Sequence, residues 1–148
     1  MKIGYARVST TDQNLEAQLE ELQNSGCEEV FQEKRSGADS EREELAAALR
    51  MIRKKDIFIV TKLDRMARSM VDFWNIVQEI EDKGASVQVL NMSFDTASSQ
   101  GRLMMGVLAS VAEFERSLIR ERQQDGIERA RREGKHLGRP QMDEQLKA

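Results

Sequence analysis

Hydrophobic residues follow two alternating periods along the chain up to about residue 90. Blocks rich in β-branched residues predict four strands, at about residues 2–8, 29–32, 57–61 and 86–90. Between these blocks apolar residues return every three or four positions, which is the period of an amphipathic helix. This alternation predicts an α/β fold in three layers: a mostly parallel sheet of four to five strands flanked by helices.

Capping residues mark the expected ends of the helices. The three expected helices run from Thr11 or Asp12 to about residue 25, from the capping box Ser40-Glu41-Arg42-Glu43 onwards, and from Asp64 to Gly84. The residues expected to face the core are Leu15, Leu19 and Leu22 in the first helix, Leu45, Leu49 and Ile52 in the second, and Met66, Met70, Phe73, Val77 and Ile80 in the third. Polar segments at about 34–39 and 94–100 are expected to be loops.

The last third of the chain predicts one long helix, from about 101 to 133, because no residue there forces a stop. A heptad-type seam with spacings of 3, 4, 3 and 4 is formed by Met104, Val107, Val111, Phe114 and Leu118. At 1.5 Å per residue such a helix is ~50 Å long and must outrun a small domain, which favours a seam between two copies. The alternative is a helix packed on its own sheet with a charged, frayed end.

Beyond this seam the helix becomes basic. Its cations, and those that follow it, are Arg120, Arg122, Arg129, Arg131, Arg132, Lys135 and Arg139. The net charge of −3 mildly disfavours a nucleic-acid partner, but binding depends on where cations cluster rather than on their total. The second half of the helix is therefore expected to be solvated or to contact an anion.

Length and cysteine content narrow the class of protein. A chain of 148 residues predicts one domain, and the single cysteine, Cys27, excludes an internal disulfide. This cysteine usage favours the reducing cytoplasm. The sequence shows no paired Cys/His spacing, so we expect no structural metal and no cofactor. No apolar run approaches the length of a membrane span.

An arginine in the first strand suggests a ligand. Side chains alternate along a strand, so Tyr5, Arg7 and Ser9 share one face. A charged side chain on a central strand is costly unless an anion meets it. Ser9 lies where the strand ends, and ligands of open α/β sheets bind at that carboxyl edge.

Further arginines are expected at the same edge. Arg65 and Arg68 would lie in the first turn of the third helix, where the helix dipole disfavours cations, and Arg42 lies near the start of the second. Several guanidinium groups around a serine suit a phosphodiester, since planar forks bind its oxygens and offset developing charge. The alternative for each arginine is a surface salt bridge with one of the many Asp and Glu residues.

Five blocks of sequence resemble the serine recombinases of the resolvase/invertase type. They are Tyr5-Ala6-Arg7-Val8-Ser9-Thr10-x-Asp12-Gln13, Lys62-Leu63-Asp64-Arg65-x-x-Arg68-Ser69, Gly101-Arg102-Leu103, Ala112-Glu113-x-Glu115-Arg116-x-x-Ile119-x-Glu121-Arg122 and Gly138-Arg139-Pro140. The resemblance runs from residue 2 to about 140. Each block alone is weak, but five in order at matching spacing are specific.

The resemblance implies site-specific DNA strand exchange, with Ser9 as a nucleophile that becomes joined to a 5′ phosphate. By likeness Arg7, Arg65 and Arg68 surround the scissile phosphate. The other implied site residues are Arg42 and Arg116, which complete the cluster, Asp64 as the active-site carboxylate, and Tyr5, Gln13 and Glu115 in support. No metal or nucleotide is implied. The general base stays open: Asp64 could accept the proton or only orient Arg65, and His136, the only histidine, lies in the basic tail.

The resemblance also implies partners. Double-stranded DNA would be the substrate, and homodimers joined through the long helix would assemble into a synaptic homotetramer. The implied organisation is a catalytic core at 1–100, a dimerisation and DNA-contacting helix at 101–134, and a basic arm at 135–148 that begins a missing DNA-binding domain. The arm is expected to enter the minor groove. Two other functions stay open from the residues alone: a non-catalytic phosphate or nucleotide sensor that dimerises, and a hydrolytic phosphodiesterase.

Overall fold

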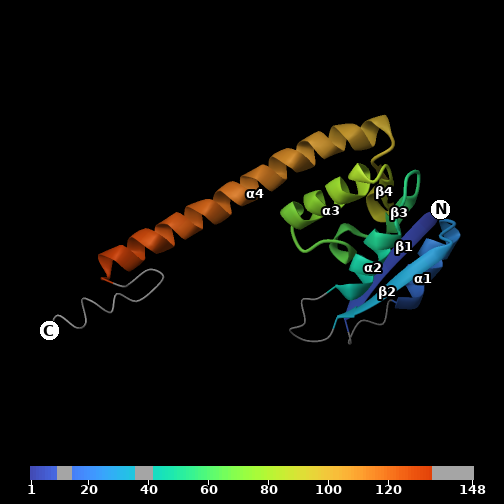
Figure 1. The fold of residues 1–148 in the computed structure, drawn as a ribbon, viewed down its shortest axis with the longest axis horizontal. Helices are drawn as coiled ribbons and strands as arrows, with labels where there is room; N and C mark the ends of the chain where they lie inside the picture. The colour runs from blue at the N-terminus through green and yellow to red at the C-terminus, as the bar shows by residue number, and fades with distance from the viewer. Residues whose placement is uncertain (10–14, 36–41, 135–148) are drawn as a thin grey trace. The chain divides into compact units, whose positions relative to one another are not determined.

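The computed structural model describes residues 1–9, 15–35 and 42–134, with Ser9 and Arg35 described by their main chain alone. The elements are β1 (Lys2–Ser9), α1 (Leu15–Asn24), β2 (Glu29–Arg35), α2 (Glu43–Met51), β3 (Ile57–Val60), the 3₁₀ turn η1 (Leu63–Arg65), α3 (Met70–Asp82), β4 (Ser86–Val89), the 3₁₀ turn η2 (Leu90–Met92), β5 (Phe94–Asp95) and α4 (Ser99–Arg132). The strands form one sheet in the order β2-β1-β3-β4-β5, in which only β5 is antiparallel to its neighbour (Figure 1). The predicted α/β class is confirmed.

The sheet is covered on both faces, as predicted. On one face Ala6 and Ile59 pack with Leu22 of α1, and Leu15 and Leu19 join them. On the other face the buried side chains of the central strands pack with α2, α3 and the start of α4; they include Ile3, Tyr5, Phe58, Leu45, Phe73, Val77, Ile80 and Met105. Successive residues of β1 thus enter opposite cores, because strand side chains alternate between the faces.

Two predicted loops contain strand. β2 continues to Arg35, in register with Ser9 of β1, so pairing with the central strand overrides the polar composition of its last residues. Phe94 and Asp95 form β5, paired with Val89 and Gln88 of β4. The prediction of a loop was wrong at residues 34–35 and 94–95, and also at 99–100, where α4 already begins; residues 36–39 lie outside the described part.

α2 begins at Glu43, the last residue of the predicted capping box, rather than directly after Ser40. Arg42 occupies the cap position without a side-chain cap bond. The carboxylate of Glu33, on the neighbouring strand β2, instead accepts hydrogen bonds from the main-chain N–H groups of Glu44 (3.3 Å) and Leu45 (3.2 Å). Ser40 and Glu41 lie outside the described residues, as do the predicted caps of α1. A side chain distant in sequence therefore caps this helix.

The third helix also starts later than predicted. Asp64 lies in η1, and α3 begins at Met70 with Ser69 as its N-cap, whose Oγ accepts a hydrogen bond from the main-chain N–H of Asp72 at 3.1 Å. Arg65 and Arg68 therefore precede the helix, and the prediction that they lie in its first turn was wrong. Ser69 wins as the cap because a hydroxyl at this position satisfies an orphan N–H of the first turn.

α4 is one continuous helix, as predicted, and it contributes to two compact units. The first unit is Met1–Ala112 and the second is Glu113–Ala148. Within the first unit Met105 is buried, and Met104 and Leu108 pack against the core around it. None of the described helices is long and apolar enough to span a membrane.

Gly101→Ala will lower the free energy of unfolding by about 2–3 kcal/mol, because an added Cβ would overpack the site. That atom would lie 1.7 Å from the main-chain oxygen of Asp95. Gly106→Ala is the matched control on the same helix, since its Cβ would meet nothing within 4 Å. It should stabilise the protein by about 0.5–1 kcal/mol through helix propensity. Urea unfolding followed by circular dichroism measures both; equal effects would refute the predicted close approach.

Candidate active site

The carboxyl end of β1 lacks a strand on one side. β1 pairs with β3 only as far as Gly4, opposite Ile59, whereas its pairing with β2 continues to Ser9. β3 ends at Val60, and η1 follows beside β1. From Tyr5 onwards, the side of β1 that faces β3 and η1 is therefore held by side-chain contacts and not by main-chain pairing with a strand.

Arg7 and Arg65 cross-link β1 and η1. The Nη2 group of Arg7 donates a hydrogen bond to the main-chain oxygen of Asp64 at 2.5 Å, and Nη1 of Arg65 donates to the main-chain oxygen of Arg7 at 3.2 Å. Gln18 of α1 donates to the same Arg7 oxygen at 3.3 Å. The structure thus brings Arg7, Asp64 and Arg65 together, two residues along the strand from Ser9. Arg7 and Arg65 are both half-buried.

Asp64 projects its carboxylate toward solvent. Its side chain is 76% exposed, and Oδ1 lies 4.0 Å from Nε of Arg65. At that separation the pair is a weak ion pair, and the carboxylate retains capacity to accept hydrogen bonds. Asp64 is therefore not the N-cap of the third helix that the sequence predicted. Its position suits either accepting a proton or orienting Arg65.

A second cluster is built around Asp72. Arg42 binds the Asp72 carboxylate with two hydrogen bonds, Nη1 to Oδ2 at 2.7 Å and Nη2 to Oδ1 at 3.0 Å, and Nη1 also donates to the main-chain oxygen of Met66 at 3.1 Å. Oδ2 also accepts the main-chain N–H of Arg68 at 2.9 Å. Burial alone would raise the pKa of Asp72, but the hydrogen bonds from Arg42 and Arg68 outweigh it and hold the pKa below its usual value. The hydrogen bond to Asp72 likewise raises the pKa of Arg42.

Tyr5 and Glu33 form a third, buried cluster. The Tyr5 hydroxyl donates to Oε1 of Glu33 at 3.1 Å, and the same carboxylate caps α2. Burial, followed by the charge of Glu33 and its hydrogen bond, raises the pKa of Tyr5 far above its usual range, while the charges of Arg7 and Arg42 act in the opposite direction. Tyr5 is thus electrostatically linked to both arginine clusters. Sequence reasoning missed Glu33 and Asp72; Glu33 lay just beyond the predicted end of the second strand, where nothing in the pattern distinguished it.

The raised pKa of Tyr5 has a measurable consequence at alkaline pH. The pKa of Tyr5 is higher in the folded than in the unfolded protein. Its ionisation therefore leaves the free energy of unfolding unchanged below pH ~10 and lowers that free energy as pH rises further. We expect wild type to lose up to about 1.4 kcal/mol more per pH unit above pH ~10 than Tyr5→Phe, in urea unfolding. Tyr5 is the only tyrosine, so tyrosinate absorbance reports it alone. Tyrosinate appearing near its ordinary pKa in the folded protein would contradict the buried pair.

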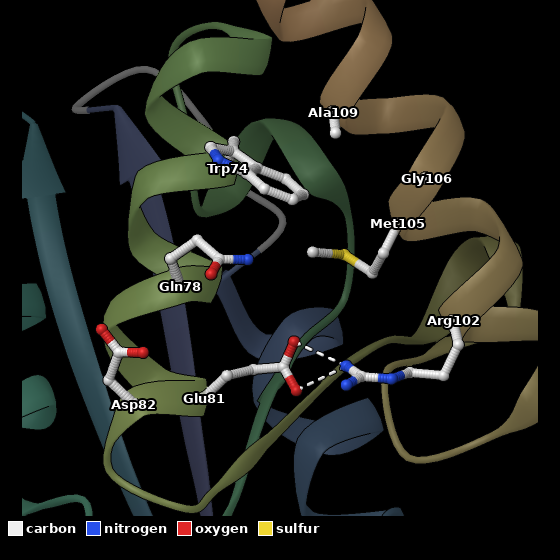
Figure 2. Close-up of a pocket in the computed structure, with 8 residues that line it drawn as sticks. All are labelled: Trp74, Gln78, Glu81, Asp82, Arg102, Met105, Gly106 and Ala109. Carbon is white, nitrogen blue, oxygen red and sulfur yellow. Dashed lines mark hydrogen bonds and ion pairs between the residues drawn. The ribbon is translucent and has the colours of Figure 1, made fainter.

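A groove elsewhere in the first unit contains none of these residues. It measures about 490 Å³ and lies between α3 and α4 (Figure 2). Arg102 spans it, with Nη1 lying 2.8 Å and 2.7 Å from the two carboxylate oxygens of Glu81. Arg102 of the Gly101-Arg102-Leu103 block therefore joins two helices here. Among the described residues no group of three side chains suits a metal ion.

A sequence model of one protein family, described as "Resolvase, N terminal domain", matches residues 2–136. The chain belongs to the resolvase family of serine recombinases. Among its relatives, the "Serine recombinase gin" of Escherichia phage Mu is 43% identical over 140 residues, which cover 95% of this chain and 72% of that protein. The "DNA-invertase" of Escherichia phage P1 is 43% identical over 139 residues, covering 94% of this chain and 75% of that protein.

Solved structures agree with the resolvase-family assignment. A "resolvase family site-specific recombinase" from Streptococcus pneumoniae has a TM-score of 0.70 and 28% identity, over 88% of this chain and 99% of that one. The N-terminal catalytic domain of TP901-1 integrase has a TM-score of 0.69 and 29% identity, over 80% of this chain and 98% of that one. The resemblance seen in the sequence blocks is confirmed.

Apart from Gln13, the remaining predicted residues of this recombinase belong to its second unit. Within that unit Arg116 lies 3.6 Å from Glu113, and Arg120 lies 3.1 Å from the same carboxylate. Glu115 is half-buried beside them. The exposed cations of α4 within this unit are Arg120, Arg122, Arg129, Arg131 and Arg132. Gln13, Lys135, His136 and Arg139 lie outside the described residues.

Three seam positions of α4 expose their side chains. Val107 and Val111, in the first unit, are 59% and 40% exposed, and Phe114, in the second, is 65% exposed. Met104 and Leu118 are half-buried. Large apolar side chains exposed at heptad spacing are typical of a protein–protein contact.

Proposed function

We propose that this serine recombinase breaks and rejoins double-stranded DNA at specific sites, with the Ser9 hydroxyl as nucleophile. The observation that carries the proposal is the cross-link between β1 and η1, where Arg7 donates to the main-chain oxygen of Asp64 and Arg65 donates to the main-chain oxygen of Arg7, two residues from Ser9. It concentrates positive charge at the carboxyl end of a central strand, where α/β sheets bind ligands. Site-specific recombination is the activity of the family to which the chain belongs.

The proposed chemistry is a transesterification. Ser9 Oγ loses its proton and attacks phosphorus, and the bond from phosphorus to O3′ breaks as O3′ takes up a proton. The products are a 5′-phosphoserine ester and a free 3′-hydroxyl. After strand exchange a new 3′-hydroxyl attacks the ester and releases Ser9, so one phosphodiester is traded for another and no external energy source is required.

The arginines supply the electrostatic part. We propose that Arg7, Arg65 and Arg68 contact the phosphate oxygens, where preorganised donors offset the charge that develops in the transition state. Arg42 and Arg116 complete the set in this proposal, Tyr5, Gln13 and Glu115 support it, and Asp64 accepts the serine proton or orients Arg65. A hydrolytic phosphodiesterase would instead leave cleaved ends that are free of protein.

The proposed partners follow from α4. The exposed apolar positions would pair two copies into a homodimer, and two dimers would form the tetramer that exchanges strands. The cations of the second unit, with Lys135 and Arg139, would contact the DNA backbone, so binding should weaken steeply with salt. The single cysteine suits the cytoplasm. Family membership does not favour the alternative of a non-catalytic phosphate sensor.

Covalent capture tests the proposal. The protein is incubated at low salt with duplex oligonucleotides of randomised central sequence, and covalent complexes are precipitated with detergent and potassium, treated with protease, and sequenced. We expect strands blocked at the 5′ end by a protein remnant, paired with free 3′-hydroxyls that a polymerase extends. Cleaved ends without bound protein, or linkage to the 3′ end, would refute the serine transesterification.

A further inference from the structure

Asp72 binds two arginines of the candidate site, one by its guanidinium and the other by its main chain. Its carboxylate accepts hydrogen bonds from both Nη groups of Arg42 and from the main-chain N–H of Arg68. We propose that Asp72 is a positioning residue of the recombinase: it fixes the Arg42 guanidinium and the main chain that carries Arg68, so that the site is ordered before DNA arrives. This inference rests on the proposed function.

The turn between η1 and α3 is held at three successive places. Arg42 binds the main-chain oxygen of Met66, Asp72 binds the N–H of Arg68, and the Ser69 hydroxyl accepts the N–H of Asp72. Met66 in turn donates its N–H to Leu63 in η1. A displacement of Asp72 would therefore change the turn that presents Arg68.

The pair is well suited to hold a fixed geometry. The side chains of Arg42 and Asp72 are 18% and 23% exposed, so solvent competes little for their hydrogen bonds. A planar guanidinium bound by both oxygens of a carboxylate also has a defined orientation, which a single contact does not impose. Arg42 comes from the start of α2 and Asp72 from the first turn of α3. This Arg42–Asp72 pair, here called the clamp, thus joins two helices that are far apart in the sequence.

A purely structural role is the competing explanation, because the same contacts also attach α2 to α3. The two roles differ in their effect on the free energy of unfolding. If Asp72 positions Arg42 for the reaction, removing its charge should slow catalysis while Arg42 is present by more than the loss of folded protein explains. If the contact only attaches α2 to α3, the slowing should match the loss of folded protein in each variant, because residues in contact couple in stability as well.

A double-mutant cycle on the rate of covalent capture separates them when each rate is expressed per folded protein, with the folded fraction taken from urea unfolding; it uses wild type, Asp72→Asn, Arg42→Gln and the double variant. We expect Asp72→Asn to slow adduct formation about 10- to 100-fold, because misplacement of a positioning contact by about 1 Å has that effect. In the Arg42→Gln background the further loss should be under about threefold. Asp82→Asn, an exposed carboxylate on the same helix, should react like wild type. An equal loss in both backgrounds, or no loss in Asp72→Asn, overturns the inference.

A second measurement needs no DNA. Nitrogen NMR of the arginine side chains should show separate Nη resonances for Arg42 in wild type, because the two-point contact hinders rotation, and one averaged resonance in Asp72→Asn. Identical Arg42 spectra in the two proteins overturn the clamp even if recombination is confirmed. A wild type that forms no adduct overturns the proposed function and this inference together, whereas a reactive wild type with additive losses overturns the inference alone.

Discussion

Ser9→Ala will abolish the covalent protein–DNA adduct. Without Oγ there is no atom that can form the phosphoserine ester, so the capture signal should fall by about four orders of magnitude or more, to background. DNA binding should persist, because the arginines and the basic half of α4 remain. The measurement is the covalent-capture assay, run beside a gel-shift titration at the same low salt.

Ser25→Ala is the matched control for this loss. Ser25 follows α1, and its hydroxyl donates to the main-chain oxygen of Glu21, an exposed contact within one turn. The substitution should leave both adduct formation and DNA binding within about twofold of wild type, as surface changes usually do. An adduct that survives in Ser9→Ala would assign the nucleophile to another residue.

We expect Phe114→Glu to convert the proposed homodimer into a monomer. Phe114 lies in the exposed apolar seam of α4, and a charge there would be buried against a second copy without a partner. In a two-fold interface each copy contributes one new carboxylate, so the cost of burying the charge arises twice. We expect the dissociation constant to rise about 100-fold or more, measured by light scattering over a concentration series.

Gln123→Glu adds the same charge on the opposite side of the helix. Nine residues separate the two positions, and at 3.6 residues per turn that is half a turn away. Gln123 is exposed, and its substitution should leave the mass unchanged at every concentration. If wild type and Gln123→Glu both have the mass of a monomer at every concentration, the seam does not join copies of this chain. Equal dissociation by both variants would point to general charge repulsion instead.

The alternation of elements could be predicted from sequence because each element has its own period of burial. The leucines of α1 recur at helical spacing on its one buried face, whereas β3 is apolar throughout because both of its faces are buried. β5 could not be predicted, since two residues show no period and Phe94 is buried through its pairing with β4. The start of α3 was misplaced because Asp64 and Ser69 are both good caps, and only the packing of η1 against β1 decides between them.

The candidate site was accessible to sequence reasoning only in part. Arg7 and Ser9 stand out because a charge in a central strand and a serine at its end are unusual. Asp72 and Glu33 do not stand out, because an acid in the first turn of a helix and an acid in a strand near the surface are both common. Their importance depends on contacts across elements, Asp72 to Arg42 and Glu33 to Tyr5, which no local pattern encodes.

The early end of β3 has a mechanical consequence. A strand paired on both sides moves only if main-chain hydrogen bonds to a neighbouring strand break. On the side of β3, however, the end of β1 is held only by a few guanidinium contacts. Releasing each such contact costs about 0.5–3 kcal/mol, which thermal motion or an incoming anion can supply. The tip of β1, together with the end of β2 to which it stays paired, can therefore be re-aimed while the pairing of β1 with β3 stays intact, as would suit the proposed nucleophile in a forward step and its reversal.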